Sequence, residues 1–284
     1  MSSLGQEEAD RYAVIGHPVA HSLSPLIHEA FARQTGQRIS YERIEAPLDG
    51  FVRTVEAFFG TGGQGCNVTV PFKGEAARFV AHLDPEAAFA EAVNTIVHDP
   101  AGGYAGYNTD GPGLVTDLDR LLHGAGSLHV LLLGAGGAAR GVARPLLAGP
   151  AGRLTIANRT QDRAQALAVR LAAAGLGEVQ AVSFDELAGP FDLVINATSA
   201  GLGGRVPGIS GSVVEGAFCY DMMYGRETAF CRWALSAGAR AAEDGLGMLV
   251  GQAALAFELW RGVRPDAEPV RRALRARLDQ GGER

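Results

Sequence analysis

The segment NVTVPFK carries polar side chains and a lysine in an arrangement that a purely structural segment does not require. Successive side chains of a strand point to opposite faces, so Asn67 and Thr69 share one face and the two valines share the other. Lys73 follows at the expected first turn of a helix, where a cation opposes the helix dipole at a cost of about 0.3–1 kcal/mol. These three polar residues are therefore candidates for a functional site.

A second polar cluster, HSLSP, lies between an apolar run and an amphipathic segment. Pro25 suits the first position of a helix and Ser24 its N-cap, so capping alone explains Ser24. Ser22 lies outside the expected helix, and two hydroxyl groups at a helix N-terminus also form a small anion site. The residues alone leave both interpretations open.

The segment HVLLLGAGGAARGVARPLL predicts a buried strand, a glycine turn and a helix. GAGGAA fits GxGxxA, the fingerprint of dinucleotide binding. Its first glycine allows a tight turn, its second lets backbone N–H groups approach a pyrophosphate, and Ala139 allows close packing of helix on strand. The candidate cofactor residues here are Gly134, Ala135, Gly136, Gly137 and Ala138. The alternative is an ordinary glycine-rich turn.

The next strand indicates which dinucleotide is bound. NAD-binding folds usually carry an acidic residue about 20 positions after the glycine turn, where it bonds the ribose 2′-hydroxyl. Here the strand RLTIAN ends in Asn158, Arg159 and Thr160, with no carboxylate at that end. An arginine can pair bidentately with a 2′-phosphate, and the two neighbours can add hydrogen bonds. We therefore predict NADP(H); a surface arginine that opens a helix is the alternative.

A later strand, FDLVINATSAG, places Asn196, Thr198 and Ser199 at its carboxyl end. Open α/β sheets bind ligands at that edge. These residues either line the nicotinamide ribose or only hold a strand-end turn.

Two further residues complete a possible acid–base set. Asn94 lies in AVNT, and Asp110 ends GYNTD. A lysine and an aspartate beside a nicotinamide favour acid–base chemistry on an alcohol or a ketone. Lys73 and Asp110 are the candidate pair, although a surface salt bridge is the simpler interpretation when the pair is taken alone.

Gln252 stands out on the helical segment GMLVGQAALAFELW. Its neighbours three and four positions away are Met248, Leu249, Leu255 and Ala256, which are all apolar. A polar side chain on an apolar stripe needs a hydrogen-bond partner if it is buried. That partner is either a ligand or the backbone.

These residues must be positioned by secondary-structure elements, and strand-like runs alternate with amphipathic helical runs along the chain. This alternation predicts an α/β fold with mainly parallel sheets. The exception is AVNTIVHDPAGGYAGYN, where two short strand-like runs flank a glycine turn and predict a hairpin. The length of 284 residues allows one large domain or two ordinary ones, and a boundary near residues 108–110 follows the hairpin.

Composition narrows the class further. The chain is 47% hydrophobic and 20% charged, which is typical of a soluble globular protein, and its net charge of −6 argues against nucleic-acid binding. Its three cysteines fit neither a zinc site nor a CxxC motif, so a reduced cytoplasmic compartment is expected. We expect no metal, because no cluster has ligand spacing. We expect no membrane contact, because no apolar run is long enough and the polar, acidic N-terminus is no signal peptide.

Together the motifs resemble the shikimate dehydrogenase family. HSLSP, NVTVPFK, AVNT, NTDG, GAGGAAR, NRT, NATSAG, YDMMY and DGLGMLVGQAALAFELW occur in the family's order and spacing and cover nearly the whole chain. The resemblance implies reversible NADPH-dependent reduction of 3-dehydroshikimate to shikimate, a late step in making chorismate and the aromatic amino acids. We expect a monomer or a homodimer.

The resemblance makes Lys73 and Asp110 the catalytic pair. Lys73 would bind the oxygen of the reacting carbon, and either donate the proton or stabilise negative charge there. Asp110 would accept a hydrogen bond from a neighbouring hydroxyl and hold Lys73 in place. Val68 and Val70 would pack inside the protein, opposite the face that meets the substrate.

The remaining roles are also implied by the resemblance. The substrate-binding residues would be Ser22, Ser24, Asn67, Thr69, Asn94, Tyr224 and Gln252. The cofactor-binding residues beyond the glycine turn would be Asn158, Arg159, Thr160, Thr198, Met222, Gly245 and Met248. For the two methionines, a plain core position explains the residue type equally well.

The family's architecture predicts a discontinuous substrate domain. Its C-terminal helices return to the first domain, so we predict a substrate-binding domain of residues 1–109 plus 245–284. Residues 110–244 would form a Rossmann-like NADP-binding domain. One departure from the family is that MMYGRETAF lacks the proline often seen after its tyrosine, which should alter only a loop.

Three alternatives are weighed against this interpretation. A quinate/shikimate dehydrogenase of the same family would often replace Ser24 with threonine and sometimes accept NAD. A non-catalytic NADPH-binding sensor would have no need of both Lys73 and Asp110. A protein sharing only the cofactor domain, such as a methylene-tetrahydrofolate dehydrogenase, gives no reason for the serine loop or for NVTVPFK.

Overall fold

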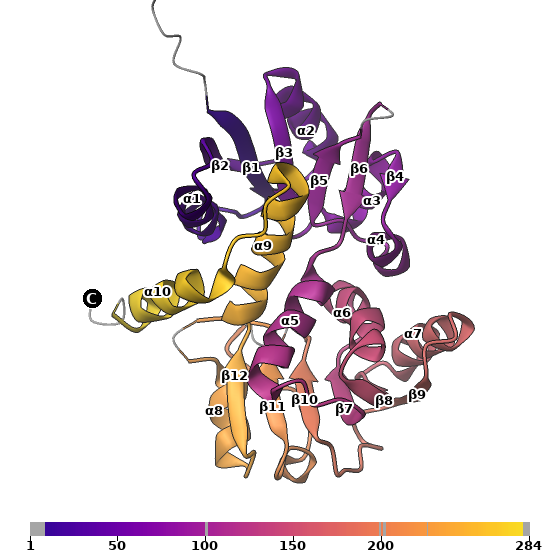
Figure 1. Cartoon of the computed structure of the whole chain (residues 1–284). Helices are drawn as coiled ribbons and strands as arrows, with labels where there is room; N and C mark the ends of the chain where they lie inside the picture. Colours follow the sequence, from indigo (N-terminus) through magenta and orange to yellow (C-terminus); the bar gives the residue numbers. More distant parts are fainter. Residues whose placement is uncertain (1–8, 100–101, 199, 201–202, 226, 281–284) are drawn as a thin grey trace, which may run out of the picture. The chain divides into compact units, whose positions relative to one another are not determined.

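The computed structural model describes residues 9–99, 102–198, 200, 203–225 and 227–280. Two six-stranded sheets organise them into two compact units (Figure 1). The first unit takes the described residues up to 88, then 92–109 and 253–270. The second takes 89–91, 110–252 and the described residues from 271 onward. The predicted α/β class is confirmed, because strands and helices alternate in both units.

The first unit contains a mixed sheet in the order β2-β1-β3-β5-β6-β4. Only β5 runs against its neighbours, and its antiparallel pairing with β6 confirms the predicted hairpin. The elements that begin in this unit are β1 (Asp10–Gly16), α1 (Ser24–Thr35), β2 (Ile39–Glu45), α2 (Phe51–Gly60), β3 (Gly63–Val68), α3 (Lys73–Phe79), β4 (His82–Leu83), α4 (Pro85–Ala90), β5 (Thr95–His98) and β6 (Tyr104–Tyr107).

Alternation along β1 divides its side chains between two apolar clusters of this unit. Ala13 and Ile15 pack with residues of α2 and α3, whereas Tyr12 and Val14 pack with Tyr41 of β2. The sheet is therefore buried on both faces at β1, as expected for a strand between two parallel neighbours.

The expectation that Val70 packs inside is wrong. β3 ends at Val68, which is 2% exposed, whereas Val70 is 63% exposed. The ladder between β3 and β5 stops at Asn67, and the last bond toward the β5 side is that of the Val68 N–H to the Asn94 carbonyl at 2.8 Å. Beyond it, the N–H of His17 donates to the Val70 carbonyl at 2.9 Å. The Val70 side chain therefore lies exposed, just beyond the end of β3.

The second unit contains a fully parallel sheet in the order β12-β11-β10-β7-β8-β9. Numbered within the unit, this is the 3-2-1-4-5-6 order of dinucleotide-binding folds. The elements here are α5 (Asp110–Leu122), β7 (Leu128–Leu133), α6 (Gly137–Ala148), β8 (Ala151–Ala157), α7 (Gln161–Ala173), β9 (Glu178–Val182), β10 (Leu193–Asn196), the short 3-10 helix η2 (Gly211–Val213), β11 (Phe218–Asp221), α8 (Ala229–Ser236) and β12 (Ala241–Asp244).

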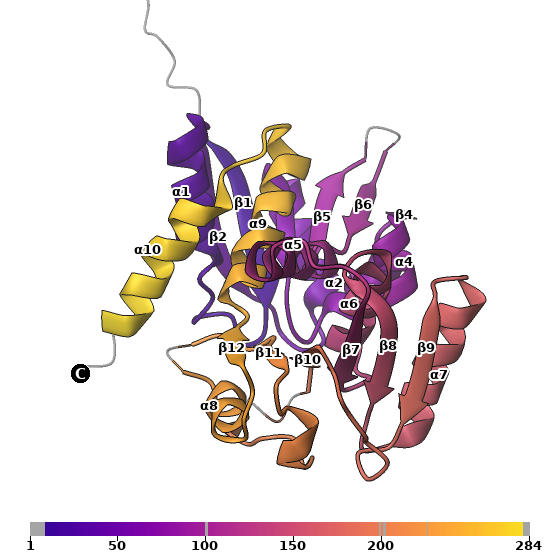
Figure 2. The same ribbon diagram turned by 60° about the horizontal axis from the view of Figure 1, so that its bottom comes forward.

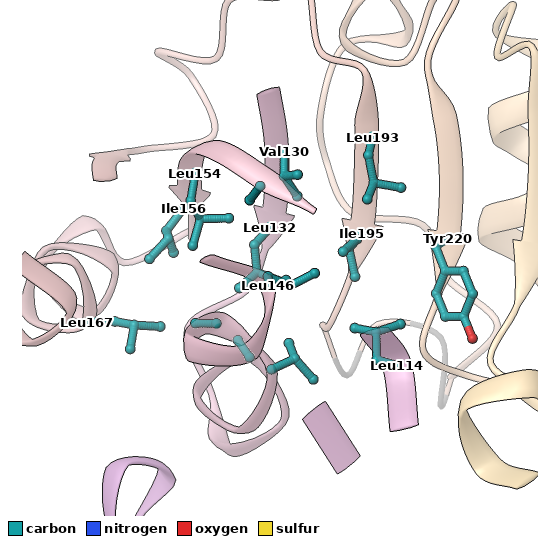
Figure 3. Close-up of a cluster of buried hydrophobic side chains, with 14 of the residues drawn as sticks. Leu114, Val130, Leu132, Leu146, Leu154, Ile156, Leu167, Leu193, Ile195 and Tyr220 are labelled. Atoms are coloured by element: carbon teal, nitrogen blue, oxygen red, sulfur yellow. The ribbon is translucent and has the colours of Figure 1, made fainter. Parts of the chain in front are cut away.

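Helices cover both faces of this parallel sheet (Figure 2). On one face, strand residues such as Leu132 and Ile195 meet Leu114 of α5 and Leu146 of α6 (Figure 3). On the other face, strand residues pack against α8. The central strands are apolar almost throughout because both of their faces are buried.

Two C-terminal helices complete the chain, α9 (Leu246–Arg261) and α10 (Ala267–Gln280). Residues 246–252 of α9 group with the second unit and the rest with the first. One reason is close packing of α9 on α5, since an added Cβ at Gly113 would lie 2.6 Å from the backbone nitrogen of Gln252. The assignment of functions to residues 1–109 plus 245–284 and to 110–244 stays a prediction.

In the described part of the chain, no helix is long and apolar enough to cross a membrane. All three cysteines are buried and have free thiols.

Candidate active site

The serine loop before α1 is ordered by its own hydroxyl groups. α1 starts at Ser24 with Leu23 as its N-cap and without a side-chain cap, so the expected capping role of Ser24 is wrong. The Ser22 hydroxyl instead accepts the Ser24 N–H at 3.2 Å and donates to the Ser24 hydroxyl at 3.1 Å. A short polar side chain that bonds the backbone two residues on is a common turn device, and it explains Ser22 structurally.

Arg43, which lies on β2 and not in the serine loop, also anchors this loop. Its Nε and Nη2 atoms both donate to the Ser22 carbonyl, at 2.9 and 2.6 Å. Both serine hydroxyls are therefore carried on an anchored backbone.

Asn67, the penultimate residue of β3, is 5% exposed and belongs to a closed network. The Tyr41 hydroxyl donates to Asn67 Oδ1 at 2.7 Å. Asn67 Nδ2 donates to the Asn94 carbonyl at 3.1 Å and to Thr95 Oγ1 at 3.0 Å. Since both amide hydrogens are used, this side chain can offer a ligand the second lone pair of Oδ1.

Aromatic side chains support the network from behind. The ring of His28, which is fully buried, stacks on Tyr41 with centroids 4.4 Å apart and lies 5.2 Å from Trp260. Within the described part of the chain neither ring nitrogen of His28 has a hydrogen-bond partner, and burial lowers the pKa of His28 to about 3. His28 is therefore a neutral ring that stacks on Tyr41 and fixes the plane of the Tyr41 ring.

Lys73 is the first residue of α3, as predicted, and is half-buried. Its carbonyl accepts the N–H of Val93 at 2.9 Å, which ties the start of α3 to the residue before Asn94. Asn94 is in turn bound to Thr109, whose N–H donates to Asn94 Oδ1 at 2.9 Å. The first unit thus brings Lys73, Asn67 and Asn94 into one hydrogen-bonded framework.

Thr69 lies just beyond β3, where its N–H donates to the carbonyl of Ile15 at 2.9 Å. An added Cβ at Gly16 would be 2.3 Å from the Thr69 methyl carbon. Gly16 therefore has to be glycine for Thr69 to stand beside the end of β1.

Three predicted residues belong to the second unit. Asp110 is the first residue of α5 and is half-buried. Gln252 is 8% exposed and its Nε2 donates to the Leu249 carbonyl at 2.8 Å. Burial raises the pKa of Tyr224, so its phenol is a hydrogen-bond donor at neutral pH.

The glycine turn between β7 and α6 has the geometry that the motif predicts. Gly134 has φ +106°, and an added Cβ there would lie 3.1 Å from the Ala197 carbonyl oxygen. Added Cβ atoms at Gly136 and Gly137 would meet nothing within 4 Å, and no side chain caps α6. An open helix N-terminus with free space over its first N–H groups fits a pyrophosphate.

Beside this turn lies a hollow of about 380 Å³ whose lining includes Gly136, Arg140, Arg163 and Arg170. Arg140 Nε is buried and has no hydrogen-bond partner among the described residues. A cationic donor without a partner fits a phosphate group of the dinucleotide. The sequence analysis gave neither Arg140 nor Arg163 a cofactor role; the available signal was three arginines spaced along α6 and α7, the first two helices after the glycine turn.

The predicted 2′-phosphate residues lie at the carboxyl end of β8. Asn158 Nδ2 donates to the Thr160 carbonyl at 2.8 Å and closes the turn. Arg159 is exposed and lies outside the lining of the hollow. Its role stays a prediction, and Arg163 is a second candidate for the same phosphate.

Thr198 is held by a buried chain of side chains. Its hydroxyl donates to Asn196 Oδ1 at 2.7 Å, and Asn196 Nδ2 donates to Asp221 Oδ1 at 3.0 Å. The Thr198 hydroxyl hydrogen is therefore used, and its oxygen also accepts the Ala200 N–H at 3.4 Å, which leaves one lone pair for a ligand. Ser199 lies outside the described residues.

Met222, Gly245 and Met248 lie near the ends of β11 and β12. Both methionines pack against the apolar cluster of the second unit, and Met248 is 8% exposed. An added Cβ at Gly245 would be 2.4 Å from the Met222 carbonyl oxygen, so only glycine fits there. A core role and a cofactor role remain compatible with these positions.

The strand order and the open glycine turn define the second unit as a dinucleotide-binding domain of the Rossmann type. Three family models match successive parts of the chain. They are described as a shikimate dehydrogenase substrate binding domain (residues 14–96), a shikimate / quinate 5-dehydrogenase (119–202) and a shikimate 5'-dehydrogenase C-terminal domain (245–275).

Individual relatives agree. A shikimate dehydrogenase (NADP(+)) of Alkalilimnicola ehrlichii is 54% identical over 94% of this chain and 98% of its own, and one of Methylobacillus flagellatus is 55% identical over 94% and 99%. The crystal structure of shikimate 5-dehydrogenase from Thermus thermophilus in complex with NADP(H) and shikimate is 33% identical, with a TM-score of 0.81 and coverage of 95% of this chain and 100% of that one. The chain belongs to the shikimate dehydrogenase family, which confirms the resemblance.

Proposed function

We propose that this protein catalyses the reversible NADPH-dependent reduction of 3-dehydroshikimate to shikimate. The relatives named above support the reaction, and the hydrogen-bonded polar residues of the first unit support the substrate. The observation that supports a proton-transfer or charge-stabilising role for Lys73 comes from the amino-acid composition. Of the 25 lysine and arginine residues, Lys73 is the only lysine, although a cation is disfavoured at the first turn of α3.

A lysine at this one position points to chemistry that arginine cannot do. A guanidinium stays protonated in proteins, whereas an ammonium can give up its proton and is a compact point charge. In our proposal the Lys73 ammonium binds the oxygen of the reacting carbon and either donates the proton or stabilises the developing charge. Asp110 accepts a hydrogen bond from a neighbouring substrate hydroxyl.

The other residues bind and orient. The hydroxyls of Ser22 and Ser24, with Thr69 and Tyr224, bind the substrate carboxylate, and Asn67, Asn94 and Gln252 bind ring hydroxyls. Asn67 does so as an acceptor, because its amide hydrogens are already used. The protein binds the substrate carboxylate at one end of the ring and hydroxyl groups at the other. This orientation determines which ring carbon faces the cofactor.

NADP(H), when bound, supplies or accepts the hydride. We propose that the open N-terminus of α6 holds its pyrophosphate and that Arg159, assisted by Arg163 and Arg140, holds its 2′-phosphate. Thr198, Gly245 and the two methionines would lie on the nicotinamide side. Cytoplasmic location and a monomeric or homodimeric state are parts of the same proposal.

The second candidate is a quinate/shikimate dehydrogenase that accepts a broader range of substrates or cofactors. The family matched by residues 119–202 favours it, because that family is described as shikimate / quinate 5-dehydrogenase. The test is a turnover assay on the purified protein, with shikimate or quinate as substrate and NADP⁺ or NAD⁺ as cofactor. Turnover mainly with shikimate and NADP⁺ supports the biosynthetic enzyme. Comparable turnover of quinate or use of NAD⁺ supports the broader one, and binding of NADPH without any turnover supports a sensor.

A further inference from the structure

Both backbone groups of Gly225 are held by one ion pair. The Gly225 N–H donates to Asp244 Oδ2 at 3.1 Å, and its carbonyl accepts from Arg275 Nη1 at 2.7 Å. Arg275 Nη2 pairs with Asp244 Oδ1. A planar guanidinium can make these two bonds at once because its donors stand in a fixed fork. The carboxylate and the guanidinium thus close a ring around a single residue of the loop after β11.

The same loop is anchored on the other side of Tyr224. The Met223 carbonyl accepts the Gly245 N–H at 2.9 Å, and the Met223 N–H donates to Asp221 Oδ1 at 3.2 Å. The backbone of Tyr224 therefore lies between two residues whose peptide groups are both bound. Its ring position depends on how firmly these neighbours are held.

Arg275 is the most distant of these residues in the sequence. It comes from α10, 31 residues after Asp244, and its side chain is 27% exposed, whereas that of Asp244 is 7% exposed. A carboxylate buried to this extent needs a counter-charge, since an unpaired buried charge is strongly destabilising. Asp244 also accepts the Leu246 N–H at 3.1 Å, so the ion pair links α10, the Gly225 loop and the first turn of α9.

We propose that Arg275 is a positioning residue for substrate binding, which it serves by fixing the Tyr224–Gly225 peptide. The proposal rests on the proposed role of Tyr224 as a donor to the substrate carboxylate. Removal of the guanidinium frees the Gly225 carbonyl, so the phenol of Tyr224 samples more positions. The Met222 N–H donates to the Asn196 carbonyl at 3.0 Å, a bond in which Arg275 takes no part, so the start of the loop stays anchored when the guanidinium is removed.

The test is a double-mutant cycle between Arg275→Ala and Tyr224→Phe, with shikimate binding measured by calorimetry and KM values measured for shikimate and for NADP⁺. We expect Arg275→Ala to weaken shikimate binding on the order of tenfold and to leave the KM for NADP⁺ within about twofold, which is typical of losing one charge-assisted hydrogen bond. In the Tyr224→Phe background, Arg275→Ala should add less than about twofold.

Arg275→Lys separates positioning from a simple charge requirement. A lysine keeps the pairing with Asp244 but cannot hold Asp244 and the Gly225 carbonyl in a fork, so shikimate binding should stay weak while the thermal midpoint recovers. It also keeps the test available if the alanine variant does not fold. Arg277→Ala, an exposed arginine on the same helix, is the matched control and should bind shikimate like the wild type.

The outcomes distinguish the two proposals. If Tyr224→Phe weakens shikimate binding but Arg275→Ala does not, or if the two losses simply multiply, the positioning role is wrong and the proposed function stands. If Arg275→Lys restores binding fully, Arg275 contributes only charge and the positioning role is again wrong. If Tyr224→Phe leaves binding unchanged, the substrate role of Tyr224 fails and the inference fails with it.

Discussion

At the scale of single residues, lysine and arginine differ at position 73 in what they can do with a proton. Lys73→Ala should lower kcat with shikimate by about 10² or more, with a small change in KM, because proton transfer assists only the transition state. Lys73→Arg keeps the charge but cannot release a proton, so it should be nearly as inactive. Steady-state kinetics of both variants give the answer. A rise in KM alone for Lys73→Ala would mean that Lys73 only binds the substrate. An active Lys73→Arg variant would mean that the reaction needs only a positive charge at position 73.

The cofactor preference is also set by single residues. Arg159→Ala should raise the KM for NADP⁺ about tenfold or more and leave that for NAD⁺ nearly unchanged, because only NADP⁺ carries the 2′-phosphate. Arg163→Ala, on the wall of the arginine-lined hollow, serves as the comparison. If either variant loses both cofactors equally, that arginine does not read the 2′-phosphate.

At the scale of elements, the close packing of α9 on α5 depends on a residue without a side chain. An added Cβ at Gly247 would lie 2.1 Å from the carboxylate of Asp117. Asp117 cannot move away freely, because it accepts the Tyr220 hydroxyl at 2.8 Å and pairs with Arg120 at 2.7 Å. Gly247→Ala should therefore lower the free energy of unfolding by roughly 1–3 kcal/mol.

Urea unfolding followed by circular dichroism measures this effect. The control is Gly126→Ala, because an added Cβ there meets nothing within 4 Å, and it should change stability by less than about 0.5 kcal/mol. Equal stability of the two variants would mean that α9 shifts freely on its neighbours.

The edges of the sheets show where element prediction fails. The sequence patterns predict the central strands, but they do not indicate β9 (EVQAV) or β12 (AAED). Each of these strands pairs on one side only and carries an exposed glutamate, Glu178 or Glu243, so it lacks the apolar run of a strand buried on both faces. A parallel neighbour, rather than its own composition, makes such a segment a strand.

At the scale of the whole molecule, buried His28 couples stability to pH. Its pKa is about 3 in the folded state and about 6.5 when unfolded, because burial excludes the charged form. Below pH 6.5 the unfolded state therefore binds a proton that the folded state does not. Stability falls as pH decreases from there toward 3, by up to about 1.4 kcal/mol per pH unit from this residue.

His28→Phe keeps an aromatic ring between Tyr41 and Trp260 and removes the titration. Its unfolding free energy, measured in urea at a series of pH values, should depend less steeply on pH between 4 and 6 than that of the wild type. Gly126→Ala, which removes no titrating group and adds a Cβ that meets nothing within 4 Å, should keep the wild-type slope. Identical slopes for all three proteins would show that His28 does not contribute to acid destabilisation.

The sequence by itself determined the family, the α/β class, the glycine turn, the hairpin and the start of α3 at Lys73. These features depend on local requirements, namely the period of apolar residues, the backbone freedom of glycine and the order of motifs along the chain. The tertiary structure decided the solvent-facing side chain of Val70, the lack of a capping role for Ser24 and the partners of Arg43, Arg140 and Arg275. An arginine on an amphipathic helix has the same local pattern whether it meets water or a carbonyl oxygen many residues away. Only the packing of distant elements fixes which backbone atom or carboxylate it reaches.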